Sequence, residues 1–286
     1  MIKLENYEVM GWEHAIRGMR NPMNSWDKSD TCFGDVSCSL CPEHTPGTAH
    51  CDMIKHGKGH RIGPNDLDLM MRLAKAGPVH GKFRRMITVY VDITAPLYWW
   101  KEFDTYKVGT VANSCSTMHK IHAKEFTMDD FSTEHLYPEV REAFENTIIK
   151  YLNEARKTYN FLSDTPGKKE AWWQMIQLLP SSYNQKRTVQ LNYEVLANIY
   201  EYRKNHKLDE WRGFCEWIET LPYSEIITKS KDADEYDKGF EAGRAWVNAK
   251  IYSAYKALHG GFTEEALGYL GELLDDHKEP TDDSRE

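Results

Sequence analysis

The apolar positions of this chain recur mainly at the three- and four-residue spacing of amphipathic helices. The first such helix is expected after Pro64, where Leu67, Met70 and Leu73 share one face and Gly77 ends the pattern. The same spacing predicts helices over residues 138–162, 170–179, 192–205 and 208–220, and a helical hairpin over residues 236–258 and 263–274.

Two stretches follow the patterns of β-strands instead. Residues 86–93 (MITVYVDI) alternate and are rich in β-branched side chains, and Pro96 breaks the strand soon afterwards. Residues 186–191 (KRTVQL) suit a second strand or an extended stretch, and residues 1–25 contain a short strand and a polar turn. These elements predict an α+β fold with few strands and a helical majority.

Length and composition divide the chain into three expected parts. Its 286 residues, 41% of them hydrophobic, can bury one sizeable core with an added subdomain. We expect residues 1–64 to form an N-terminal segment with a Cys/His-rich insertion and residues 65–223 to form the core. Residues 224–286 are expected to hold a charged linker, the helical hairpin and an acidic tail.

The charge of the chain narrows the classes of partner. A formal net charge of −8 argues against broad binding to nucleic acid or to anionic membranes, although a local basic pocket is compatible with it. No apolar run approaches the length of a membrane span, and the first residues lack the pattern of a signal peptide. We therefore expect a cytoplasmic protein whose six cysteines are thiols or metal ligands and not disulfides.

Residues 31–64 are unusually rich in soft metal ligands. One Cys-x-x-Cys pair lies among four cysteines and four histidines, which are Cys32, Cys38, Cys41, Cys51, His44, His50, His56 and His60. Thiolate and imidazole at this density suit a tetrahedral structural zinc ion, with the four cysteines as candidate ligands. The alternative is a loop of free thiols, because a second Cys-x-x-Cys pair is absent.

Two further stretches, residues 93–119 and 179–211, mix polar and cationic side chains with aromatic ones inside otherwise ordered segments. Such a mixture is costly to bury unless the polar groups meet a ligand or one another. We interpret both stretches as walls of one site for an anionic, aromatic ligand. Lys186 and Arg187 are the candidate phosphate ligands, with ordinary surface cations as the alternative.

Other residues of these stretches have two interpretations as well. Asn192 and Arg203 lie three helical turns apart on one face, which suits either a ring bearing carbonyl groups or a solvated face of ion pairs. Cys115 is either a nucleophile or an inert thiol, and we favour the thiol because only His119 lies nearby as a base.

The two stretches together resemble the flavin-dependent thymidylate synthase family of the ThyX type. That family has the run Gln-x-x-Arg-His-Arg-x-x-Ser-x-Asn-Glu-x-Ser-x-Arg-Tyr after an Ala-Pro-like step. Laid without gaps on ITAPLYWWKEFDTYKVGTVANSCSTMH, its motif positions fall on Glu102, Thr105, Tyr106, Lys107, Thr110, Ala112, Asn113, Cys115, Thr117 and Met118. The later family segment, Leu-Pro through Arg and Asn to a second Arg, falls on Lys186 (with Arg187 beside it), Asn192 and Arg203.

The resemblance covers about residues 65–222 and implies a fold, an activity and an assembly. The fold would be a helix-rich α+β fold with a small antiparallel sheet. The activity would be C5 methylation of dUMP to dTMP, with FAD as cofactor and methylene-tetrahydrofolate and NADPH as co-substrates. The assembly would be a homotetramer whose sites are each built from several subunits.

The resemblance also assigns roles to residues. Arg203 would be catalytic, stabilising charge on the pyrimidine carbonyl. The substrate would be bound by Glu102, Asn113, Cys115, Ser116, Lys186, Arg187 and Arg203, and the flavin by Thr105, Tyr106, Lys107, Thr110 and Asn192.

The chain departs from the family at the Arg-His-Arg motif, which is Thr105-Tyr106-Lys107 here and supplies one cation in place of two. One alternative is therefore a non-catalytic nucleotide-binding protein on the same fold. Another is a related enzyme for a different pyrimidine nucleotide, because Asn113 and Thr117 replace the Glu and Arg that meet the nucleotide in the family.

Overall fold

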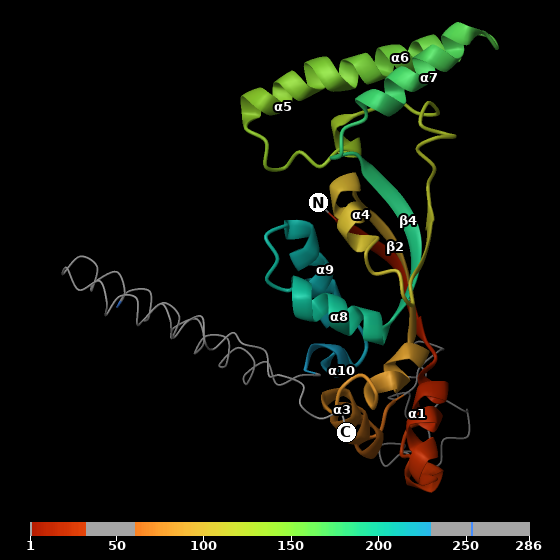
Figure 1. Cartoon of the computed structure of the whole chain (residues 1–286), viewed down its shortest axis with the longest axis vertical. Helices are drawn as coiled ribbons and strands as arrows, with labels where there is room; N and C mark the ends of the chain where they lie inside the picture. Colours follow the sequence, from red (N-terminus) through yellow and green to blue (C-terminus); the bar gives the residue numbers. More distant parts are fainter. Residues whose placement is uncertain (1, 33–60, 230–252, 254–286) are drawn as a thin grey trace, which may run out of the picture. The chain divides into compact units, whose positions relative to one another are not determined.

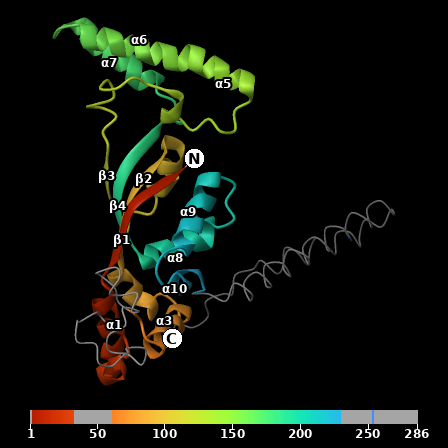
Figure 2. The ribbon, with the colours of Figure 1, turned by 180° about the vertical axis from the view of Figure 1, so that it is seen from behind.

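A four-stranded antiparallel sheet organises the protein, in a computed structural model that describes residues 2–32, 61–229 and 253. Its strands lie in the order β1-β2-β4-β3 (Figures 1 and 2). They are β1 (Lys3–Met10), β2 (Thr88–Pro96), β3 (Val111–Ser114) and β4 (Asn184–Asn192). Both strands expected from alternation, residues 86–93 and 186–191, are confirmed as β2 and β4, which pair along their whole length.

The two faces of this sheet differ sharply in burial. Successive side chains of a strand point to opposite faces, and β2 buries Val89, Val91 and Ile93 to within 1% of full burial on one face. Three helices cover this face, α4 (Leu97–Phe103), α8 (Tyr193–Arg203) and α9 (Asp209–Glu219), as Figures 1 and 2 show from opposite sides. The sheet therefore has a helix-covered face and a second face that carries polar side chains such as Asp92.

Helix α4 and helix α1 (Trp12–Arg20) were not expected from the sequence. The aromatic run of residues 98–100 belongs to α4, and its tryptophans Trp99 and Trp100 are almost completely buried. This burial makes both tryptophans part of the main core.

Helices α1 and α3 (Pro64–Lys75) meet at one end of the main core. Helix α3 confirms the helix expected after Pro64. Asp66, which is completely buried, accepts hydrogen bonds from Arg20, Ser29 and Thr31. Close by, Cys32 and Arg61 exchange two backbone hydrogen bonds of 3.0 and 2.9 Å. Short 3₁₀ helices flank this region at Asn21–Met23, Trp26–Lys28 and Gly81–Met86.

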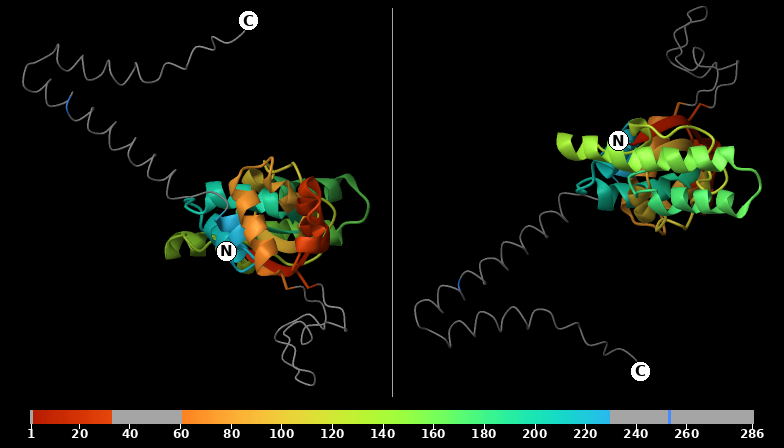
Figure 3. Two further views of the ribbon diagram at one scale, coloured as in Figure 1. Left: turned by 90° about the horizontal axis from the view of Figure 1, so that it is seen from below. Right: turned by 90° about the horizontal axis from the view of Figure 1, so that it is seen from above.

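A second, smaller hydrophobic core lies among the helices between β3 and β4. The expected helix of residues 138–162 is confirmed, but it consists of α5 (Pro138–Phe144), a π-helical turn (Glu145–Ile149) and α6 (Lys150–Phe161). The antiparallel partner is α7 (Pro166–Leu178), which lies beside α6 when the molecule is seen from above (Figure 3). A further 3₁₀ turn, Met128–Asp130, precedes them, and Leu152 and Met175 are fully buried between the helices.

Residues 2–32 and 61–229 belong to one compact unit. The segment expected to be a linker begins with a short helix, α10 (Glu225–Thr228), whose Ile226 and Ile227 are buried in the main core. The expected hairpin of residues 236–274 lies outside the described residues, apart from the helical Ser253. No helix within residues 2–32 and 61–229 is both long and apolar enough to cross a lipid bilayer.

Candidate functional site

The C-terminal end of α4 places two acidic side chains next to two arginines on the helix-covered face of the sheet. The buried Trp99, Trp100 and Phe103 fix this seven-residue helix in the core. Glu102 in its last turn and Asp104 at its C-cap therefore emerge from a rigid support.

Glu102 contacts Arg203, which comes 101 residues later at the end of α8. The Arg203 Nη1 donates to Glu102 Oε2 at 2.8 Å, and the Arg203 Nε donates to the Tyr106 hydroxyl at 3.0 Å. The guanidinium also lies over the ring of Trp211, with its central carbon 4.7 Å from the ring centroid. This cluster brings together three residues that the sequence had selected from two distant stretches.

The indole of Trp211 completes the cluster and was not anticipated. Its Nε1 donates to Glu102 Oε2 at 2.9 Å, so Trp211 and Arg203 share one carboxylate oxygen. No donor among the described residues reaches the other oxygen, Oε1, and the Glu102 side chain is 35% exposed. The cluster therefore presents a cation beside a carboxylate oxygen that is free to accept a hydrogen bond. The cation can donate to an acceptor group of a heterocycle, and the oxygen can accept from an adjacent donor group.

His206 lies at the edge of the same cluster with a defined tautomer. Its Nδ1 accepts a hydrogen bond of 3.2 Å from the Leu208 amide, which can only donate. The neutral ring therefore carries its proton on Nε2, which faces Glu102 Oε2 at 3.6 Å.

Arg187 forms the second acid–arginine pair on this face. Its Nη1 donates to Asp104 Oδ1 at 2.7 Å and its Nε to Gln185 Oε1 at 3.0 Å. The guanidinium lies 4.1 Å above the ring centroid of Trp100. Gln185 is held in turn by its own donation to the Cys115 carbonyl.

The loop between these pairs and β3 runs beside α8. Tyr106 meets Arg203 at the end of α8, and Gly109 meets Asn192 at its start. Gly109 has a φ of +79°, and a Cβ there would lie 2.9 Å from Asn192 Nδ2, so only glycine fits. Asn192 caps α8 by accepting from the Glu194 and Val195 amides.

Two donors on this loop and cap have no hydrogen-bond partner within residues 2–32 and 61–229. They are the buried Thr110 hydroxyl and Asn192 Nδ2. Lys107, which is exposed, is the cation of this loop. These donors are therefore free to meet a ligand.

Three other candidates lie on the opposite face of the sheet. Lys186 is adjacent to Arg187 in β4 and therefore points away from it, to pair with Asp92 at 3.1 Å and with Glu5 at 3.8 Å. Asn113 pairs in register with Thr188 on that face. Cys115 is exposed, and its amide donates to the Lys186 carbonyl. A single chain therefore does not gather these three with Arg187 and Arg203, as the expectation of a shared phosphate site had assumed.

Two candidates make local contacts. The Thr105 hydroxyl donates to the Glu102 carbonyl at 2.7 Å, and the Ser116 hydroxyl accepts from the Met118 and His119 amides at 3.1 Å. Both side chains stabilise turns.

The metal prediction concerns mainly residues outside the described part of the chain. Cys38, Cys41 and Cys51 lie there, whereas Cys32 forms the backbone bridge to Arg61. Among the residues that are described, no group of three or more His, Cys, Asp or Glu side chains is arranged to hold a metal ion.

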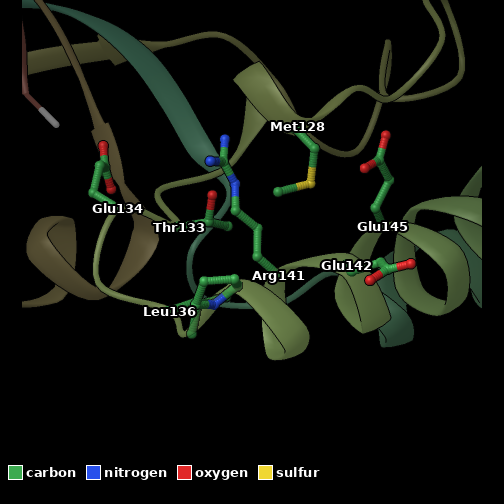
Figure 4. A pocket seen from close by; sticks show the side chains of 8 residues that line it. Met128, Thr133, Glu134, Leu136, Arg141, Glu142 and Glu145 are labelled. Carbon is green, nitrogen blue, oxygen red and sulfur yellow. The ribbon is translucent and has the colours of Figure 1, made fainter.

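A pocket of about 380 Å³ lies at a different place, between the 128–136 segment and α5. Arg141 extends into it beside Thr133, and Glu134, Glu142 and Glu145 also line it (Figure 4). Three carboxylates against one cation do not suit a phosphate. The arginine clusters beside α4 therefore remain the candidate site.

Comparison with known proteins supports the fold. No protein-family model and no curated protein matches the sequence. Two solved structures of thymidylate synthase X (ThyX) from Helicobacter pylori, with FAD and dUMP, are similar over 81% of this chain and 99% of theirs. Their TM-scores are 0.51 and 0.50 and their sequence identities 14% and 13%. The chain therefore has the helix-rich fold, with its small antiparallel sheet, that these thymidylate synthases have.

Proposed function

We propose that this protein is a flavin- and folate-dependent enzyme that methylates a pyrimidine nucleotide at C5, with dUMP as the substrate. The observation that carries the proposal is the convergence of Glu102, Tyr106 and Arg203 on one face of a fold shared with enzymes solved with FAD and dUMP. All three fall on motif positions of the family, where Arg203 keeps the family's residue and Glu102 and Tyr106 stand in place of Gln and His.

Arg203 has the surroundings that charge stabilisation on a pyrimidine requires. Its side chain is 20% exposed and held by Glu102, Tyr106 and the ring of Trp211, so its guanidinium is oriented before any ligand binds. In the proposed reaction it donates to a pyrimidine carbonyl oxygen and stabilises the negative charge that develops as C5 becomes nucleophilic. Arg187, flat on Trp100, binds the 5′-phosphate.

The loop beside α8 fits the ring system of a flavin. The Thr110 hydroxyl and Asn192 Nδ2 are donors without a partner in the described part of the chain, and Tyr106 adds an aromatic surface. With Lys107 they would hold FAD, which in its reduced form supplies hydride while methylene-tetrahydrofolate supplies the one-carbon unit and NADPH the electrons. One cation suits a flavin ring edge better than a pyrophosphate, so the phosphates would need further contacts.

An assembly of several subunits could supply these further phosphate contacts. It would also give a role to the candidates on the face of the sheet opposite to the helices. Lys186, Asn113 and Cys115 lie behind the sheet in their own chain. In the proposed homotetramer they would complete the site of another subunit. The oligomeric state in solution tests this part of the proposal independently.

The alternative of a non-catalytic nucleotide-binding protein has its own supporting observation. Both arginines are already neutralised, Arg203 by Glu102 and Arg187 by Asp104. A purified protein that is colourless and takes up no added FAD would favour this alternative.

The enzyme proposal is tested by dTMP formation from dUMP with FAD, NADPH and methylene-tetrahydrofolate, compared between Arg203→Ala and Arg72→Ala. Arg72 is an exposed arginine of α3 that pairs with Asp68, so it matches the charge change away from the site. Loss of the Arg203 side chain should lower turnover at least about 100-fold, as removal of other oriented charge-stabilising donors does. Arg72→Ala should change nothing, and full activity of Arg203→Ala rules out its role. Parallel assays with dCMP and UMP decide the substrate.

A further inference from the structure

The guanidinium of Arg187 is positioned from the inside of the protein. Its plane lies on Trp100, which is 1% exposed, and its Nε donates to Gln185, which is 8% exposed. Gln185 Nε2 donates in turn to the Cys115 carbonyl at 2.9 Å. Because these partners are buried, Arg187 keeps its position whatever happens at its outer edge.

Asp104 is the partner at that outer edge. Its Oδ1 accepts from Arg187 Nη1 at 2.7 Å, but its side chain is 51% exposed whereas that of Arg187 is 15% exposed. An ion pair with such an exposed partner contributes little to stability, about 0–1 kcal/mol. Asp104 can therefore leave Arg187 without uncovering any part of the core.

Glu102 differs from Asp104 in this respect. Its carboxylate also accepts from the buried Trp211 indole, so its departure from Arg203 would strand a buried donor. Of the two acid–arginine pairs, only the pair of Asp104 and Arg187 is built to exchange its anion.

We propose that Asp104 is an internal competitor that occupies the phosphate position of Arg187 until a phosphomonoester displaces it. The inference rests on the proposed function, because it takes the phosphate to be that of the nucleotide substrate. A phosphomonoester carries almost two negative charges above its second pKa, near 6, and can bind the guanidinium through two oxygens. It outcompetes a single carboxylate, whereas an uncharged nucleoside does not. Asp104 thereby lowers the affinity of the protein for phosphorylated ligands and leaves the affinity for an uncharged nucleoside unchanged.

The test is calorimetric titration of the full-length protein and of Asp104→Asn with dUMP, inorganic phosphate and deoxyuridine. Asparagine keeps the shape of the side chain and removes its charge. The dissociation constants for dUMP and phosphate should fall about two- to fivefold, the range that an exposed ion pair can account for. Binding of deoxyuridine should not change.

Two controls separate this exchange from a general change of charge. Asp68→Asn removes the same charge from an exposed Asp–Arg pair in α3 and should leave all three affinities unchanged. In an Arg187→Ala background, Asp104→Asn should have no effect on phosphate affinity. An equal gain in that background, or in Asp68→Asn, overturns the proposal.

The outcomes also distinguish this inference from the proposed enzyme. If dUMP binds and Asp104→Asn does not tighten it, the internal competitor is wrong while the enzyme proposal stands. If phosphate binding tightens in Asp104→Asn but no dTMP forms, the competitor stands and the enzyme fails. Absence of phosphate and dUMP binding in both proteins overturns the inference.

Discussion

Removal of the Glu102 carboxylate is the most informative perturbation of the Arg203 cluster. Glu102→Ala leaves the Nε1–H of Trp211, a completely buried residue, without an acceptor. An unpaired buried donor costs about 1–3 kcal/mol. The lost ion pair with Arg203 adds up to about 1 kcal/mol, because both partners are partly exposed. The free energy of unfolding should therefore fall by about 1–4 kcal/mol.

Glu102→Gln separates these two contributions. The amide oxygen of glutamine can still accept from Trp211 Nε1, so only the charge is lost. The expected destabilisation is at most about 1 kcal/mol. Urea unfolding followed by tryptophan fluorescence and by circular dichroism measures both variants.

A double-mutant cycle with Trp211→Phe tests the assignment directly. Phenylalanine has no N–H, so Glu102→Ala should cost at least about 1 kcal/mol less in that background. Two results would refute the shared-oxygen geometry as the source of rigidity at Arg203. One is an equal loss of unfolding free energy in Glu102→Ala and Glu102→Gln. The other is a loss in Glu102→Ala that stays the same in the Trp211→Phe background.

Two further predictions concern titration elsewhere in the protein. Burial raises the pKa of Asp66, but hydrogen bonds from Thr31, Ser29 and Arg20 lower it by more, so its folded pKa lies below its ordinary 3.8. The contribution of Asp66 to stability is therefore present above about pH 4 and lost as the pH falls through the folded pKa. Asp66→Asn should unfold at lower urea concentration at pH 7, and its free energy of unfolding should fall less between pH 7 and pH 3 than that of the unmodified protein. An equal fall in both proteins contradicts this. Burial raises the pKa of Cys215 to about 12. Iodoacetamide at pH 8 should therefore label the exposed Cys115 and spare Cys215 in the folded protein, which peptide mapping measures. Equal labelling of the two cysteines contradicts the burial of Cys215.

The sheet and the longer helices could be predicted because their patterns are strong and local. Residues 86–93 alternate cleanly, and β2 has one buried and one exposed side as that alternation requires. In contrast, all four residues of β3 are exposed, so no hydrophobic pattern marked it. The seven residues of α4 were missed because a run of adjacent aromatics has no visible helical period, and tertiary burial decides its structure.

The predicted site residues fall into two groups in the structure. Sequence reasoning selected Glu102, Tyr106 and Arg203, which the structure brings into contact. It also grouped Lys186 with Arg187, although both lie in a segment already assigned as extended, where neighbours point to opposite faces. The hydrogen bond from the Trp211 indole to Glu102 was not predicted, because no sequence pattern pairs an indole N–H with a particular carboxylate.

The paired backbone hydrogen bonds between Cys32 and Arg61 have a consequence for the length of the chain between these two residues. They hold residues 32 and 61 side by side, next to the hydrogen bonds that Asp66 and Thr31 accept. The entropic cost of closing a loop grows only slowly with its length. The positions of the sheet and of the arginine clusters therefore do not depend on how many residues separate Cys32 from Arg61.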